Sequence, residues 1–168
     1  MADPRRLCAV SRYRGVSGLE KGSSAKMKYT MHKWTELGPL MIAYSTGGRM
    51  VDDVFEKFVH DLKTRPIRAY LGANVGNFEI TSIQRKYIAQ ELKGKNLVLA
   101  IVTDELLVRG IVTAVSWLGM NVRSFSWAEM RSALRYLALP PHLDDKALEI
   151  IQQLKKSCEE ELRRGPKE

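Results

Sequence analysis

The order of hydrophobic and polar positions predicts a strand pair at the start of the folded region. Residues 28–37 alternate roughly between apolar and polar side chains, which is typical of a strand with one buried face. The turn-forming pair Gly38 and Pro39 follows, and residues 40–45 form a second short apolar run. Together they predict a β-hairpin.

Beyond the hairpin, helical and strand patterns alternate. Apolar residues at three- and four-residue spacing predict the helices, and short apolar runs predict the strands. Gly47 and Gly48 are expected to lead into the first helix, and residues 72–77 to form a loop. The expected helices are 50–63, 80–92, 104–118 and 127–139, and the expected strands are 67–71, 96–102 and 122–126.

This order, β-β-α-β-α-β-α-β-α, predicts an α/β domain with a mostly parallel sheet over residues 27–139. A further amphipathic helix is expected over residues 142–164, where it could pack on its own domain or pair with a second copy to form a dimer. The pattern does not determine the strand order, so a flavodoxin-like sheet is an alternative.

Composition favours one globular domain without a membrane span. The chain has 168 residues, of which 45% are hydrophobic and 27% charged. No apolar run approaches the roughly 20 residues that span a bilayer, and the N-terminus lacks a signal-like apolar segment, so we expect a cytoplasmic protein. Cys8 and Cys158 lie far apart and are expected to be free thiols.

Positive charge is concentrated near the N-terminus. The net charge is +8, and residues 1–34 hold eight Lys or Arg against two acidic residues. Residues 1–26 are rich in Gly and Ser and predict a flexible basic arm, which could be a solvated tail or could bind nucleic acid. Met27, just before the periodic sequence, is an alternative start.

The sequence contains no recognisable catalytic constellation. His32 is expected on the edge hairpin, His60 near a helix end and His142 beside two prolines, and none has metal-ligand spacing to another His, Cys or carboxylate. We therefore expect neither an enzyme nor a metal or other cofactor. Trp117 lies in an apolar helical stripe and is expected in the core, whereas Trp127 is expected to be partly exposed.

Polar residues after two predicted strands define an alternative small-ligand or nucleotide site. Gly47 and Gly48 follow Ser45 and could present backbone N–H groups to an anion, although they could equally form only a tight turn. Asp104 follows the central strand, where open α/β sheets bind ligands, or else caps the next helix. Neither segment contains a P-loop or a dinucleotide-binding glycine pattern.

The hexapeptide at residues 78–83, Phe-Glu-Ile-Thr-Ser-Ile, resembles a motif of the STAS domain (sulfate transporter and anti-sigma-factor antagonist). That family, best known from bacterial anti-anti-sigma factors, has Phe-x-Asp-Ser-Ser/Thr-Gly at a helix start. Phe78, Thr81 and Ser82 match in place, whereas Ile80 replaces the Asp and Ile83 the Gly. The element order over residues 28–139 is also similar.

The resemblance implies a regulatory module for signal transduction that binds an anti-sigma-factor-like or kinase-like protein. Thr81 or Ser82 would be the phosphorylated switch residue, and a phosphate there would meet the positive end of the helix dipole. The partner-binding surface would comprise Asn74, Asn77, Phe78, Glu79, Gln84 and Arg85. Alternatively, Thr81 and Ser82 only cap the helix, with Phe78 as a hydrophobic staple.

Overall fold

The computed structural model describes residues 29–164. The predicted basic arm at residues 1–26, the alternative start Met27 and the thiol of Cys8 lie outside the described residues. The nucleic-acid alternative, which depends on that arm, therefore stays a prediction.

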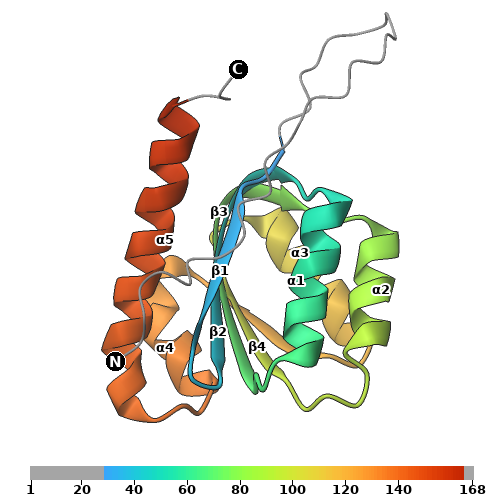
Figure 1. Cartoon of the computed structure of the whole chain (residues 1–168). Helices are drawn as coiled ribbons and strands as arrows, with labels where there is room; N and C mark the ends of the chain where they lie inside the picture. Colours follow the sequence, from blue (N-terminus) through green and yellow to red (C-terminus); the bar gives the residue numbers. More distant parts are fainter. Residues whose placement is uncertain (1–28, 165–168) are drawn as a thin grey trace, which may run out of the picture.

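A five-stranded mixed sheet forms the centre of the molecule (Figure 1). Its strands are β1 (His32–Leu37), β2 (Leu40–Arg49), β3 (Ala69–Glu79), β4 (Val98–Val102) and β5 (Asn121–Phe125). β1 pairs antiparallel with β2, and every other neighbouring pair is parallel. The predicted α/β class, with its N-terminal hairpin and mostly parallel sheet, is confirmed.

The strands lie in the sheet in the order in which they follow along the chain, β1-β2-β3-β4-β5. Because right-handed crossovers then all step the same way, the three helices that connect the parallel strands cover one face (Figure 1). These are α1 (Asp52–Thr64), α2 (Ser82–Glu91) and α3 (Leu106–Trp117). The order contains no reversal, unlike the flavodoxin order 2-1-3-4-5, in which a switch point forms the ligand crevice.

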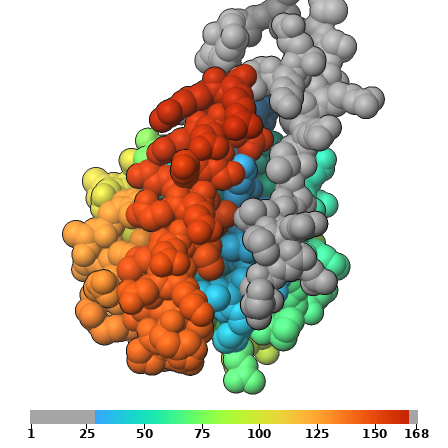
Figure 2. All heavy atoms as spheres, turned by 60° about the vertical axis from the view of Figure 1, so that its left-hand side comes forward, coloured from blue at the N-terminus to red at the C-terminus, as the bar shows by residue number. Residues whose placement is uncertain are grey.

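The opposite face is covered by the last two α-helices, α4 (Met130–Tyr136) and α5 (Asp144–Arg164). Short 3-10 turns, Trp127–Glu129 and Pro141–Leu143, precede them. α5 buries Ala147, Ile151, Leu154 and Cys158, a spacing of three and four residues that forms one apolar stripe. Figure 2 shows α5 lying along β1, and the predicted helix therefore packs on its own sheet.

β2 and β3 are longer than the sequence predicts. Gly47 and Gly48 lie inside β2 rather than in a turn, and residues 72–77 belong to β3 rather than to a loop. The two strands pair along nearly their whole length, and β3 has one extra residue where the register shifts after Thr46. A Cβ on Gly47 would stand 3.2 Å from the Asn77 backbone nitrogen, so glycine here permits close approach of two strands.

Trp117 is not in the core, and that prediction is wrong. It is 82% exposed, because α3 is apolar around most of its circumference and only Val108, Val112 and Val115 face inward. Trp127 is half-buried, as expected.

None of the helices within residues 29–164 has the length and apolar character needed to cross a membrane.

Candidate functional site at the start of helix α2

A capping box begins α2. The Thr81 side chain accepts a hydrogen bond from the Gln84 backbone N–H at 3.1 Å, and Gln84 Oε1 accepts one from the Thr81 N–H at 2.8 Å. Thr81 therefore caps the helix, as one of the two sequence interpretations proposed. The predicted staple by Phe78 is wrong, because Ile80 occupies the position before the cap and Arg85 the fourth helical position.

Gln84 also joins the starts of α1 and α2. Its Nε2 donates to Asp52 Oδ1 at 2.7 Å and lies 3.4 Å from the Met50 carbonyl oxygen. Gln84 is buried, and these contacts use both ends of its amide. Its role is to hold two neighbouring helix starts together.

Ser82, the first residue of α2, is exposed. Its hydroxyl is not needed for the capping box, which Thr81 and Gln84 complete between them. Arg85 and Lys86 follow at three- and four-residue spacing on the same side of the helix, and Arg85 Nη1 donates to the Ile80 carbonyl oxygen at 3.0 Å. Of the two predicted switch residues, Ser82 is thus the accessible one.

The six residues of the predicted partner surface do not all reach the surface. Asn77 and Glu79 are exposed, and Phe78 and Arg85 are half-buried. Asn74, like Gln84, is buried. Its Oδ1 accepts from the Thr103 hydroxyl at 2.5 Å and its Nδ2 donates to the Gly76 carbonyl oxygen at 2.8 Å, so Asn74 links the middle of β3 to the residue that follows β4.

Large apolar side chains are exposed at the same edge of the sheet. Ile83 in the first turn of α2 is 78% exposed, and Leu106 and Leu107 in the first turn of α3 are 81% and 65% exposed. Both helices start at the carboxyl ends of neighbouring parallel strands, so their first turns share this edge. We call Ser82, Ile83, Leu106 and Leu107 the helix-start patch. Sequence reasoning missed its leucines, although a helix that is apolar around most of its circumference must expose some apolar residues, which is a visible signal.

The residues of the predicted anion site are dispersed. Gly47 and Gly48 lie in the β2–β3 bulge, and α1 begins after Val51 with Asp52 and Asp53 in its first turn. Two carboxylates already take the positive end of that helix dipole, which disfavours an anion there.

One of the two sequence interpretations of Asp104, that it caps α3, is wrong. The N-cap residue is Glu105, whose backbone N–H donates to the Thr103 hydroxyl at 3.1 Å. Asp104 Oδ1 instead accepts from the Trp127 backbone N–H at 3.1 Å and so anchors the chain after β5.

Ser45 and His32 meet inside the protein. They are register partners on β2 and β1, and His32 Nδ1 lies 2.7 Å from Ser45 Oγ. His32 is buried, and burial lowers its pKa to about 3, so the imidazole is neutral at physiological pH. His32 lies on the edge strand, as expected, but the strand pleat turns its side chain inward. His60 and His142 are exposed.

The described residues contain no group of three or more His, Cys, Asp or Glu side chains placed to hold a metal ion.

No protein-family model matches the sequence, and a search of curated proteins finds no match.

Proposed function

We propose that this protein is a STAS-like regulatory module that binds a protein partner through the helix-start patch, with Ser82 as the switch. The observation that carries the proposal is an exposed serine at a helix start, next to an exposed Ile and at the same sheet edge as two exposed Leu side chains. Scattered single apolar residues need no explanation, but several gathered at one edge favour an interface.

The chemistry of the helix start supports a switch at Ser82. A phosphate adds about −1.5 to −2 charges at neutral pH, and the N-terminal turn of a helix stabilises negative charge. Arg85 and Lys86, one turn further, supply cations within reach. Because Ile83 is adjacent and Leu106 and Leu107 share the edge, the same phosphate would place a hydrated dianion in the middle of an apolar contact.

The proposal favours Ser82 over Thr81. Phosphate on Thr81 would require the Thr81 Oγ1 atom to give up its hydrogen bond from the Gln84 backbone N–H. The capping box would then open. Ser82 can be modified while the helix start remains intact. The host compartment that fits a phosphorylation-switched module is the cytoplasm.

The experiment compares four forms of the tagged full-length chain: wild type, Ser82→Asp, Ile83→Arg and a control, Gln152→Arg, on the exposed side of α5. Proteins retained from host lysate are quantified, and each candidate is then tested as a purified pair. We expect one partner to bind wild type and control equally, and to bind both patch variants about tenfold or more weakly.

Each result bears on a different part of the proposal. Equal binding of all four forms would exclude the patch as the interface. If only Ile83→Arg lost partner binding, the interface would be supported and Ser82 would be excluded as the switch. Intact-mass and peptide analysis of the chain purified from host cells gives the modification directly, and phosphate on Ser82 rather than Thr81 is the expected result.

A further inference from the structure

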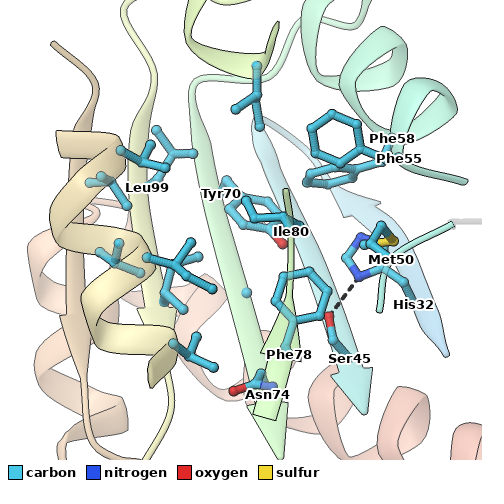
Figure 3. A pocket seen from close by; sticks show the side chains of 18 of the residues that line it. His32, Ser45, Met50, Phe55, Phe58, Tyr70, Asn74, Phe78, Ile80 and Leu99 are labelled. Atoms are coloured by element: carbon cyan, nitrogen blue, oxygen red, sulfur yellow. Dashed lines mark hydrogen bonds between the residues drawn. The ribbon is translucent and has the colours of Figure 1, made fainter. Parts of the chain in front are cut away.

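A cavity of about 100 Å³ lies between the sheet and helices α1 and α3 (Figure 3). Its position follows from the strand register. Ala43 of β2 and Gly72 of β3 are register partners whose positions face this side of the sheet, and both lack bulk. Larger side chains flank them, and Gly72 lines the hollow that results.

The wall toward the amino ends of the parallel strands is apolar except for one hydroxyl. Tyr70 and Leu99 are register partners there, on β3 and β4. The Tyr70 side chain leans along its strand, so that its hydroxyl lies 2.7 Å from where a Cβ on Gly72 would stand. Burial raises the pKa of that hydroxyl, so it stays protonated.

The opposite wall is a polar row. His32, Ser45 and Asn74 are aligned by register across β1, β2 and β3, and all three line the cavity (Figure 3). Asn74 and Ser45 have partners, as described above. His32 Nε2 is the one buried side-chain N or O atom among the described residues that has no hydrogen-bond partner.

Aromatic and branched side chains line the rest of the hollow. Phe58 meets the His32 ring edge-on with centroids 4.8 Å apart, and Phe78 stacks on it at 6.4 Å. Val112 and Val115 of α3 close the far side. No charged side chain lines the cavity, so a charged ligand would lose its hydration without gaining a counter-ion.

We propose that this cavity is a binding site for a small neutral aromatic molecule with one hydrogen-bonding group, of the size and kind of phenol. An apolar cavity of about 150 Å³ binds benzene. The hollow here has about 100 Å³ but is only partly enclosed, so an aromatic ring can enter it while part of the molecule remains at the opening. The hydroxyl would satisfy His32 Nε2, whose unmet hydrogen bond otherwise costs stability. Binding here requires neither a protein partner nor a phosphate on Ser82, so each proposal can fail without the other.

The test uses the full chain and the fluorinated probe 4-fluorophenol, followed by ¹⁹F NMR. We expect saturable binding of the probe. Unlabelled phenol should displace it at about fivefold lower concentration than benzene does, because one hydrogen bond raises affinity by about that factor. His32→Phe should reduce that preference for phenol. Val112→Phe should fill the cavity and weaken probe binding tenfold or more, whereas the matched control Thr113→Phe, on the exposed side of α3, should leave it unchanged.

A measurement on the wild type tests the proposal even if the variants fail to fold. Nuclear Overhauser contacts from bound phenol to the methyl groups of Val112 and Val115 would place the ligand in the cavity. Saturable binding without those contacts, or unaffected by a folded Val112→Phe variant, would overturn the proposal. If binding were not saturable, the cavity would hold only water, and the proposal would be overturned as well.

Discussion

Trp34 Nε1 donates a hydrogen bond to Asp61 Oδ2 at 2.9 Å inside the core between β1 and α1. Both residues are buried, and the same carboxylate oxygen is 3.2 Å from Arg65 Nη2. The edge strand is thus joined to the helix that covers it by a carboxylate with two donors.

Replacing Asp61 should therefore destabilise the protein markedly. Asp61→Ala leaves the buried indole N–H without an acceptor and removes one of the two carboxylates paired with Arg65, the other being Glu36. We expect a loss of about 2–3 kcal/mol in the free energy of unfolding. Urea denaturation followed by tryptophan fluorescence measures it. The control Asp53→Ala removes an exposed carboxylate from the same helix and should change stability by no more than about 0.5 kcal/mol. Similar losses in both variants would contradict the assigned role.

The capping box of α2 gives a second prediction. Thr81→Ala should cost about 1 kcal/mol, because the backbone N–H of Gln84 loses its acceptor, whereas Thr81→Ser should retain most of the stability. Thermal unfolding of both variants beside wild type makes the comparison. If Thr81→Ala were as stable as Thr81→Ser, the hydroxyl would not be the cap.

The buried imidazole predicts a pH dependence of stability. The pKa of His32 is about 3 in the folded protein against about 6.5 in an unfolded chain, so between these values the unfolded state binds the additional proton. The contribution of His32 is therefore fully present above pH 6.5 and is lost as the pH falls, by about 1.4 kcal/mol per pH unit below 6.

Denaturation curves between pH 7 and pH 5 test this prediction above the range in which most carboxylates titrate. His32→Phe should flatten the slope over that interval. The control His60→Gln removes an exposed histidine from α1 and should leave the slope as in wild type. A wild-type profile that is flat from pH 7 to pH 5 would show that the folded protein accepts a proton at His32.

Lys95 supplies a fourth prediction. From the loop before β4, its Nζ donates to the carbonyl oxygens of Leu62, Lys63 at 3.0 Å and Arg65 at 2.8 Å, which end α1. Lys95→Met should cost about 0.5–1 kcal/mol and speed amide hydrogen exchange in the last turn of α1. Lys93→Met, an exposed change in the same loop, is the control, and equal exchange in the two variants would contradict the capping role.

Much of the fold could be predicted because helices leave a local signal. The apolar periodicity of α1 and α5 and the alternation of strands with helices depend on neighbouring residues only. The ends of β2 and β3 could not be predicted in the same way. Gly47 and Gly76 were turn signals in the sequence, whereas the structure uses them where two backbones approach closely, and only pairing between distant segments distinguishes the two.

For the candidate site, the sequence located the start of α2 and the hydroxyl pair there but not the polar row in the cavity. His32 was within reach of prediction. A tight turn at Gly38 and Pro39 aligns Leu37 with Leu40, and counting outward brings His32 opposite Ser45. The third member, Asn74, was beyond reach, because its alignment depends on the parallel pairing of β2 with β3.

The chain-ordered sheet also has a consequence for biosynthesis. Each parallel strand pairs with the strand that left the ribosome just before it, so the sheet can grow in step with translation. α5, however, emerges last and covers β1 and β2, which emerge first. Until it arrives, the nascent chain presents the side chains of Leu40, Ile42 and Tyr44 to solvent or to a chaperone. The final helix therefore closes the apolar surface that is made earliest.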